Sequence, residues 1–289
     1  MSEVRTIAVC GAGIMGRGIA HAAALGGYRT ILQDVIPAAL EKAAREIRAT
    51  LDKAVELGKT SSADADAAFQ RIEFAGNLAD AARDADLVIE AVPEEMSLKI
   101  ETFTQLDKIT PPHAVLASNT SSLSITEIAS ITRRASQCVG MHFFNPVHKM
   151  KLLEIVRALE TSDASIQIAV EVGRRMKKET VVIKEAPGFI TSRINAMIGN
   201  EAFYMLQEGI ASAEDIDRAL KLGLNHPMGP FELVDLVGLD TRLHILEYLH
   251  KSLGEKYRPC PLLSQYVKAG RLGRKAGRGV YDYPTETKN

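Results

Sequence analysis

The 289-residue chain is predicted to fold as a doubly wound, mostly parallel α/β domain followed by a smaller all-α domain. Strand and helix patterns alternate over about the first 185 residues, which is typical of a parallel sheet with helices on both faces. A glycine-rich turn joins the first strand to the first helix. From Ala186 onward the helical period dominates, so we place a domain boundary near residue 185.

The order of apolar and polar residues predicts each element in turn. In the first domain (1–185), strands are expected at 6–10, 29–33, 87–92, 114–117, 137–142, 152–156 and 180–183. Helices are expected there at 15–25, 37–57 and 63–71, the last two forming a helical pair inserted at about 37–71. In the second domain (186–289), helices are expected at 189–207, 213–222, 231–236 and 240–253. The first of these is apolar on more than one face, which indicates a domain core or a subunit interface.

Composition excludes several classes of function. The formal net charge is −1 without blocks of like charge, which argues against nucleic acid or an anionic membrane as partner. No run of 18 apolar residues predicts a membrane helix. The three cysteines are far apart and lack a CxxC pair, so neither a disulfide framework nor a metal site is expected. The chain runs from Met1 straight into a strand without a signal peptide, and we expect a reducing, cytoplasmic setting.

The segment Gly11-Ala12-Gly13-Ile14-Met15-Gly16 lies between a predicted strand and a predicted helix. In this context the first glycine permits a tight turn, the second admits a pyrophosphate, and the third lets helix and strand pack closely. The helix N-terminus adds free N–H groups and the positive end of its dipole. The segment therefore predicts a dinucleotide site, the alternative being a simple strand–helix turn.

Asp34 stands at the end of the second strand, about 20 residues after the glycines. An acidic side chain there accepts hydrogen bonds from a ribose 2′-hydroxyl and repels a 2′-phosphate, so it favours NAD over NADP. The expected cofactor contacts in this region are Gly11, Gly13, Ile14, Met15, Gly16 and Asp34.

Small polar residues follow the strand expected at 114–117. Asn119 and Ser121 belong to the segment Ser118-Asn119-Thr120-Ser121-Ser122. The carboxyl end of a parallel strand faces the crevice where ligands bind, so both are candidates to contact substrate or cofactor. Helix capping is an alternative, since Ser122 or Ser124 can cap a helix that begins at Glu127.

A histidine and a carboxylate are expected to meet across two later strands. His142 lies between aromatic residues, where a histidine is often only part of the core, but Glu154 follows twelve positions later inside an apolar strand. A buried carboxylate is costly unless it is paired. Paired with His142, it fixes the imidazole tautomer and favours the protonated form. Oxidation of a hydroxyl to a ketone needs such a base while hydride leaves for the nicotinamide.

Together these motifs resemble the 3-hydroxyacyl-CoA dehydrogenase family, in its short bacterial 3-hydroxybutyryl-CoA dehydrogenase form. The segments that carry the resemblance are 11–16, 118–122, 141–146, 150–154, 186–190 and 225–240. They occur in order over nearly the whole chain. The resemblance implies an acyl-CoA substrate of the (S) configuration, a Rossmann-like NAD domain and a homodimer.

The resemblance also implies roles for individual residues. His142 resembles the catalytic base, Glu154 its paired carboxylate, and Ser121 the serine that bonds the substrate's 3-oxygen and lies near the nicotinamide. Further residues that are expected to contact the cofactor or its loops are Glu94, Lys99, Asn119, Asn145 and Lys275. Alternatives are helix capping for Glu94, a solvated charge for Lys99 and a turn role for Asn145, which precedes a proline.

The same resemblance places coenzyme A against the helical pair. Its basic residues could meet phosphates; they are Lys42, Arg45, Arg48, Lys53 and Lys59. Acidic residues are interleaved with them, so for most of these side chains a salt-bridged surface is the favoured interpretation.

One position departs from the family pattern. The family usually carries an asparagine that contacts substrate near the thioester, and here that position is Ser192. Asn195 lies about one helical turn further on. We expect Ser192, with a water molecule or Asn195, to take over the contact.

The predicted reaction is the NAD-dependent oxidation of a 3-hydroxyacyl-CoA. Two other classes stay open: a dehydrogenase of a free hydroxy acid or sugar acid on the same fold, and a non-catalytic NAD-binding redox sensor. His142, Glu154 and Ser121 argue against the sensor.

Overall fold

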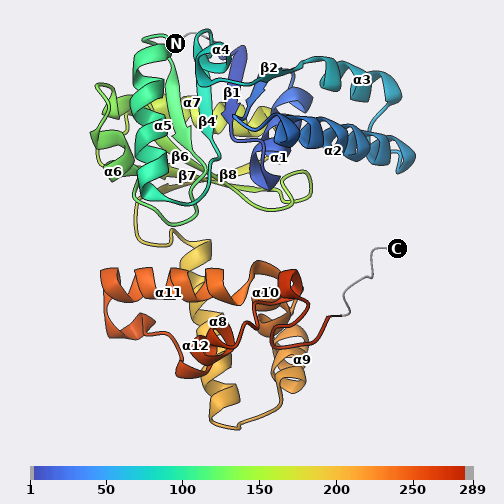
Figure 1. Ribbon diagram of the computed structural model, residues 1–289, viewed down its shortest axis with the longest axis vertical. Helices are drawn as coiled ribbons and strands as arrows, with labels where there is room; N and C mark the ends of the chain where they lie inside the picture. Colours follow the sequence, from blue (N-terminus) through green and yellow to red (C-terminus); the bar gives the residue numbers. More distant parts are fainter. Residues whose placement is uncertain (1–2, 284–289) are drawn as a thin grey trace. The chain divides into compact units, whose positions relative to one another are not determined.

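The computed structural model describes residues 3–283 of the chain. These residues form two compact units, Met1–Ala186 and Pro187–Asn289, coloured blue to yellow and yellow to red in Figure 1. The first is an α/β unit with an eight-stranded sheet, and the second is helical. The predicted fold class is therefore confirmed.

The sheet of the first unit has the strand order β3-β2-β1-β4-β5-β6-β7-β8. Its strands are β1 (Thr6–Cys10), β2 (Arg29–Gln33), β3 (Ile72–Ala75), β4 (Leu87–Glu90), β5 (Val115–Ser118), β6 (Cys138–Phe143), β7 (Leu152–Arg157) and β8 (Glu179–Lys184). Neighbouring strands are parallel except β6 and β7, which are antiparallel. The carboxyl ends of β1 to β6 consequently share one edge, and the order reverses between β1 and β4, where such sheets bind ligands.

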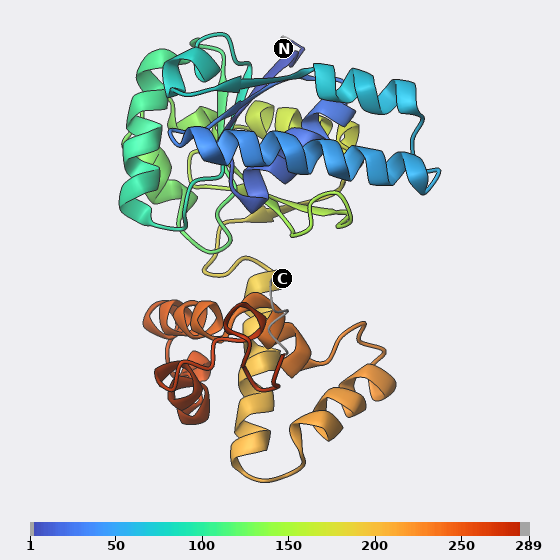
Figure 2. The ribbon, with the colours of Figure 1, turned by 45° about the vertical axis from the view of Figure 1, so that its right-hand side comes forward.

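Helices cover both faces of this sheet. They are α1 (Ile14–Leu25), α2 (Pro37–Glu56), α3 (Ser62–Gln70), α4 (Leu78–Ala82), α5 (Met96–Ile109), α6 (Ile125–Ser130) and α7 (Asp163–Arg175). Alternate residues of β1 enter different cores: Ile7 and Val9 pack with α1 and α7, whereas Ala8 and Cys10 pack with α4, α5 and α6. This explains why the strand is apolar throughout. The α2–α3 pair packs on α1 and extends beyond the sheet (Figures 1 and 2).

Helices α5 and α7 were expected only as helices between strands, without bounds, and three short elements were not predicted at all. The edge strand β3 has two exposed residues among its four, α4 has only five residues, and neither has a strong apolar period. The helix α12 (Pro261–Lys268) begins at a proline and has Leu263 as its buried residue. Strand β4 also ends at Glu90 rather than at residue 92, because the Glu90 carboxylate accepts the Val92 N–H and turns the chain.

The second unit packs its helices around one apolar cluster. They are α8 (Thr191–Gln207), α9 (Ala213–Gly223), α10 (Pro230–Val237), α11 (Leu239–Leu253) and α12. Phe203 of α8 meets Phe231 of α10 edge to face, with ring centroids 5.2 Å apart. Ile194 of α8 is nevertheless exposed, so this helix is only partly enclosed by its own unit. Among residues 3–283, no helix combines the length and hydropathy needed to cross a membrane.

Candidate functional site

The glycine loop after β1 meets the requirements of a dinucleotide site. Gly11 has φ +101°, and a Cβ there would lie 2.6 Å from the Ala91 carbonyl oxygen. A Cβ on Gly16 would lie 1.7 Å from the Gly11 oxygen, so helix and turn pack without room for a side chain. A Cβ on Gly13 would meet nothing within 4 Å. Only the middle glycine therefore faces open space, where a pyrophosphate would approach the backbone.

The N-terminus of α1 adds to this site. Gly13 is the N-cap and contributes no side-chain cap, and the first turn holds no acidic residue. Ile14 is exposed and Met15 half-buried. The first N–H groups of the helix are thus available to an anion, as the cofactor prediction requires.

Asp34, half-buried after β2, holds the glycine loop in addition to facing the site. Its Oδ2 accepts the Ala12 N–H at 2.8 Å and its Oδ1 accepts the Ile36 N–H at 2.9 Å. Each carboxylate oxygen has a further lone pair for a ribose hydroxyl. Asp34 is therefore both a candidate ribose ligand and a support for the turn.

A buried charge cluster lies at the end of β4. Lys99 on α5 is 1% exposed, and its Nζ is 2.8 Å from Glu90 Oε1 and 3.3 Å from Glu94 Oε2. The solvated-charge alternative for Lys99 is therefore wrong. Glu94 does not cap a helix either, since the N-cap of α5 is Glu95, which has no side-chain cap bond.

Glu94 binds the serine loop that follows β5. Its Oε1 accepts the Thr120 hydroxyl at 2.6 Å, the Ser121 N–H at 2.8 Å and the Ser121 hydroxyl at 3.1 Å. Burial raises the pKa of Glu94, but the charge of Lys99 and these hydrogen bonds outweigh burial and lower it. Glu94 is therefore an anion that orients Ser121.

The other residues of this loop have structural partners. Asn119 Oδ1 accepts the Phe143 N–H at 2.9 Å, so it ties the loop to the strand that carries His142. The N-cap of α6 is Ser124, whose Oγ accepts the Glu127 N–H at 3.1 Å. The capping alternative thus holds for Ser124 and is wrong for Ser122, and the helix begins at Ile125 rather than at Glu127.

His142 and Glu154 are brought together by the antiparallel β6–β7 pair. They are opposite each other in the register, and His142 Nδ1 lies 2.7 Å from Glu154 Oε2. Both are buried, and the His142 ring also lies 4.4 Å from the ring of Phe144, centroid to centroid. The pair is therefore held rigidly, with the carboxylate on the Nδ1 side of the imidazole.

The connection from β6 to β7 is held by a buried lysine. Lys178 Nζ donates to the carbonyl oxygens of Val147 and Met150, and burial lowers the pKa of Lys178. Asn145 in this connection is exposed and lines a small pocket beside α1. No sequence pattern had indicated a role for Lys178.

A groove of about 920 Å³ lies between α1, α2, this connection and the end of α7. Among the described residues that line it, Glu46 is the acidic one. The basic ones are Lys53, Lys59, Lys149, Lys151, Arg175, Lys177 and Lys178. The groove is consequently suited to an anionic ligand.

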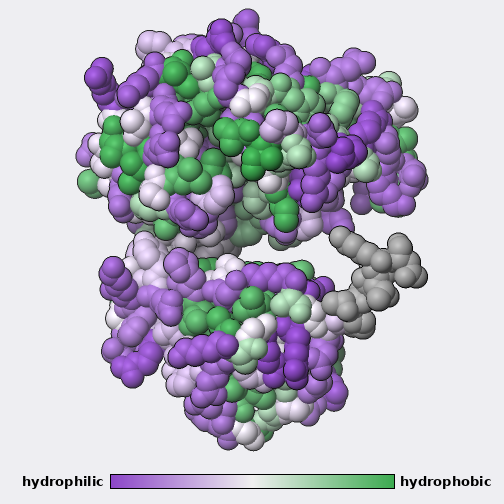
Figure 3. Space-filling view, in the orientation of Figure 1, coloured by the Kyte–Doolittle hydropathy of each residue, from purple (hydrophilic) through white to green (hydrophobic). Residues whose placement is uncertain are grey.

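Most basic residues of α2 are engaged by neighbouring carboxylates. Arg48 pairs with Asp52 and Asp66, while Lys42 and Arg45 pair with acidic residues of the same helix. Figure 3 shows hydrophilic side chains gathered over the α2–α3 pair, at the right of the view. The salt-bridged surface expected for most of them is present, and only Lys53 and Lys59 of the five line the groove.

Two of the expected site residues belong to the second unit. Ser192 is half-buried in the first turn of α8, and Lys275 Nζ lies 2.7 Å from Asp240 Oδ2. Their contacts to substrate and cofactor remain predictions.

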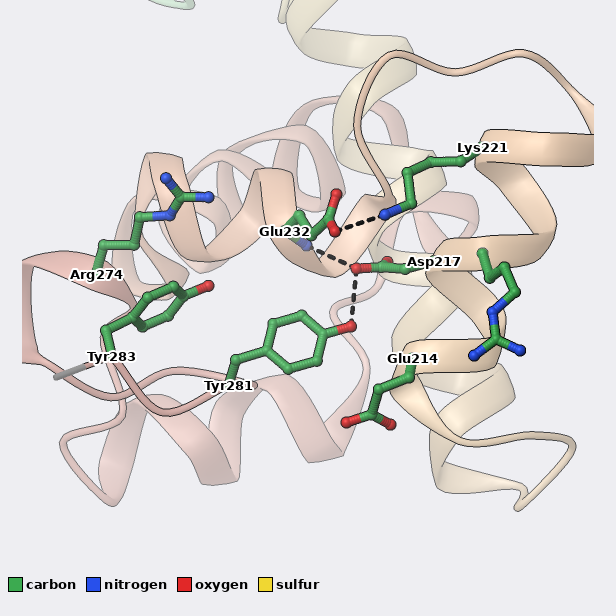
Figure 4. Close-up of a pocket in the computed structure, with 8 residues that line it drawn as sticks. Glu214, Asp217, Lys221, Glu232, Arg274, Tyr281 and Tyr283 are labelled. Atoms are coloured by element: carbon green, nitrogen blue, oxygen red, sulfur yellow. Dashed lines mark hydrogen bonds and ion pairs between the residues drawn. The ribbon is translucent and has the colours of Figure 1, made fainter.

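The second unit also contains a polar pocket of about 460 Å³, shown in Figure 4. Asp217 accepts the N–H groups of Phe231 and Glu232 in the first turn of α10, and the hydroxyl of Tyr281. Lys221 pairs with Glu232 beside them. These contacts tie α9, α10 and the C-terminal segment together, so the polar groups are explained by the fold.

Within residues 3–283, no cluster of His, Cys, Asp or Glu has the arrangement of a metal site. The three cysteines are free and buried. Glu90 is the main residue that the sequence analysis missed. It is a carboxylate at the end of an apolar strand, the same signal that identified Glu154.

Comparison with known proteins covers both units. Residues 6–186 match the NAD binding domain of 3-hydroxyacyl-CoA dehydrogenase, and residues 188–283 match its C-terminal domain. A probable 3-hydroxybutyryl-CoA dehydrogenase of Bacillus subtilis is 48% identical over 99% of both chains. A 3-hydroxybutyryl-CoA dehydrogenase of Bradyrhizobium diazoefficiens is 44% identical over 97% of this chain and 96% of its own. The crystal structure of (S)-3-hydroxybutyryl-CoA dehydrogenase PaaH1 from Ralstonia eutropha superposes with a TM-score of 0.95, at 42% identity, covering 98% of this chain and 100% of that one.

Proposed function

Since the chain belongs to the 3-hydroxyacyl-CoA dehydrogenase family and is an NAD-dependent oxidoreductase, we propose that it oxidises (S)-3-hydroxybutyryl-CoA to acetoacetyl-CoA and catalyses the reverse reduction. The observation that carries the proposal is the buried 2.7 Å contact between His142 and Glu154 at the ligand-binding edge of the sheet. The names of the relatives support the acyl group.

The proposed roles follow from the geometry. Nδ1 of His142 is engaged by Glu154, so the proton of the substrate hydroxyl passes to Nε2. Glu154 stabilises the imidazolium that forms, and in the reverse direction His142 returns the proton to the substrate oxygen. When bound, NAD supplies the hydride acceptor, and the residues placed to hold it are the glycine loop, the α1 N-terminus and Asp34.

Ser121 has one hydroxyl proton, and in this structure it is donated to Glu94. To hold the substrate oxygen, that hydroxyl has to turn from Glu94 toward the substrate. Glu94 keeps the Thr120 hydroxyl and the Ser121 N–H as donors when this happens. The loop therefore stays in place while one hydrogen bond is exchanged.

The basic groove is the proposed site for the nucleotide end of coenzyme A. Its lysines lie on α2 and in the turn after it, on the β6–β7 connection and just before β8, and a phosphorylated nucleotide would complement their charge. The smaller pocket continues from it: His21, Glu46, Thr50 and His148 line both. That pocket includes Asn145, so the two together lead along α1 toward the glycine loop.

In the second unit, Ser192 and Asn195 remain the proposed contacts near the thioester, and Lys275 the proposed cofactor contact. We also expect a homodimer formed through this unit. Several large apolar side chains are exposed on it, including Ile194, Ile210, Leu222 and Leu224. Sedimentation equilibrium of the full chain tests this, and a monomer at micromolar concentration would contradict it.

The reaction is tested by following NADH consumption with acetoacetyl-CoA, acetoacetate and a sugar-acid ketone. Turnover of acetoacetyl-CoA at least a hundredfold above the free acids supports the proposal. Preference for a free acid would establish the alternative dehydrogenase, and NADH binding without turnover of any substrate would establish the redox sensor. A series of longer 3-ketoacyl-CoA thioesters then gives the chain-length preference.

A further inference from the structure

Glu90 is a fully buried carboxylate for which the proposed reaction has no direct use. Its side chain is 0% exposed at the end of β4. Oε1 accepts from Lys99 Nζ at 2.8 Å and from the Val92 N–H at 2.8 Å, and Oε2 accepts the Ser118 hydroxyl at 2.6 Å. A carboxylate with this many donors is rigid, and it fixes each group that donates to it.

Lys99 links Glu90 to the site. It is as buried as Glu90 and lies between two carboxylates, Glu90 at 2.8 Å and Glu94 at 3.3 Å. Glu94 is 36% exposed, so it is the member of the cluster that reaches the site surface. Charges interact strongly at low dielectric. The ion pair with Glu90 sets the position of Lys99, and the position of Lys99 in turn determines where the Glu94 carboxylate lies.

The cluster then acts on two parts of the site. Glu94 fixes the N–H and hydroxyl of Ser121. Glu90 also fixes the backbone of Val92, in the segment whose Ala91 carbonyl packs against Gly11. One buried carboxylate therefore supports both the cofactor loop and the serine that is proposed to hold the substrate oxygen.

We propose that Glu90 is a positioning residue, which sets the orientation of Ser121 through Lys99 and Glu94 and holds residues 91–95 against the glycine loop. The cofactor part of this inference needs only the NAD site, while the Ser121 part rests on the proposed function. The competing explanation is an ion pair that stabilises the fold and has no effect on the site.

The two explanations are separated by Glu90→Gln, which keeps the shape and removes the charge. Lys99 then has only Glu94 as anionic partner and draws it away from Ser121. We expect the Kd for NADH, measured by fluorescence titration without substrate, to rise severalfold. The kcat with acetoacetyl-CoA should fall on the order of tenfold, as for coupled groups in one network.

Asp107→Asn is the matched control. Asp107 on α5 forms a similarly enclosed ion pair with Arg134, with a distance of 2.9 Å and side chains 9% and 14% exposed, but it contacts none of the site residues. We expect it to lower the Tm as Glu90→Gln does, with NADH Kd and kcat within twofold of the wild type. If Glu90→Gln lowers only the Tm and leaves both kinetic and binding constants unchanged, the proposal is overturned.

A second comparison, between Lys99→Met and the double variant with Glu90→Gln, does not depend on the folding of Glu90→Gln alone. Lys99→Met removes the ammonium group through which Glu90 acts on Glu94. The double variant Lys99→Met/Glu90→Gln should therefore differ in kcat from Lys99→Met by less than twofold. A further loss of fivefold or more would show that Glu90 does not act on Ser121 through Lys99 and would contradict that part of the proposal; the part that concerns residues 91–95 is tested by the NADH Kd. Because NADH binding is measured without substrate, failure of the proposed acyl-CoA reaction leaves the binding half of the test intact.

Discussion

His142 on β6 and Glu154 on β7 are directly opposite each other in the antiparallel register, with Nδ1 and Oε2 2.7 Å apart. This is the place where the sheet changes from parallel to antiparallel. The change lets a short connection return the chain beside the strand it has just left. A carboxylate twelve residues away thereby becomes the direct neighbour of the histidine.

His142→Gln should lower kcat with acetoacetyl-CoA by a factor on the order of 10² to 10⁴, the usual contribution of a general base. The NADH Kd should stay within about twofold, because the glycine loop is untouched. Steady-state kinetics and fluorescence titration measure the two quantities. His113→Gln, at an exposed histidine paired with Asp86, serves as control. Near-wild-type turnover of His142→Gln would remove His142 from the mechanism.

Glu154→Gln should keep the shape of the pair and lose the charge that stabilises the imidazolium. We expect kcat to fall on the order of tenfold or more, by less than in His142→Gln. If Glu154 acts on the reaction through the histidine, the effect of Glu154→Gln on kcat should disappear in the double variant. Additive losses in the double variant would refute this dependence.

Asp34→Asn should weaken the preference for NADH over NADPH. A charge-assisted hydrogen bond is worth roughly 1.5–3 kcal/mol, so the ratio of kcat/KM values should fall about tenfold or more. Asp34→Ala should also weaken NADH binding itself, since Asp34 holds the Ala12 and Ile36 N–H groups. An unchanged cofactor ratio in both variants would show that Asp34 does not select the cofactor.

Replacing Lys149 and Lys151 together by glutamine should raise the KM for acetoacetyl-CoA by about three- to tenfold, since exposed charge pairs each contribute up to about 1 kcal/mol. The KM for acetoacetyl-pantetheine, which lacks the nucleotide, should not change. Lys108→Gln, at an exposed lysine on α5, is the control. An equal rise for both thioesters would mean that the groove does not bind the nucleotide.

His21 should make stability depend on pH. Burial, with the nearby charges of His148 and Lys178, lowers its pKa from 6.5 to about 4. Between pH 4 and pH 6.5 the unfolded chain therefore binds more protons at His21 than the folded chain does. The contribution of neutral His21 to the free energy of unfolding is complete above pH 6.5 and is lost as the pH falls toward 4. From pH 7 to pH 5 the loss should be about 2 kcal/mol.

Urea unfolding at these two pH values measures that loss. In His21→Gln the difference between pH 7 and pH 5 should shrink by about that 2 kcal/mol, whereas the exposed His244→Gln should behave as the wild type. A pH dependence of His21→Gln equal to that of the wild type would rule His21 out as its source.

Local requirements made much of the first unit predictable. Gly11 has the positive φ of the turn, Gly16 packs against Gly11 within that turn, and Gly13 faces open space, so the spacing of the three glycines is enough to identify them. Strand and helix patterns also depend on short-range periods, and the short β3 and α4 were missed because they have too few residues to show one.

The sequence by itself predicted the fold class, NAD as the cofactor and the pairing of His142 with Glu154. Periodic patterns and the glycine turn indicate the first two, and a buried carboxylate demands a partner. Only the tertiary structure decided which charges are buried together. The sequence left a solvated charge open for Lys99, but where β4, α5 and the loop after β5 meet, Lys99 is buried between the carboxylates of Glu90 and Glu94. Which side chains are buried depends on elements that are far apart in the chain. Local patterns therefore could not show that Lys99 is buried at the centre of this network.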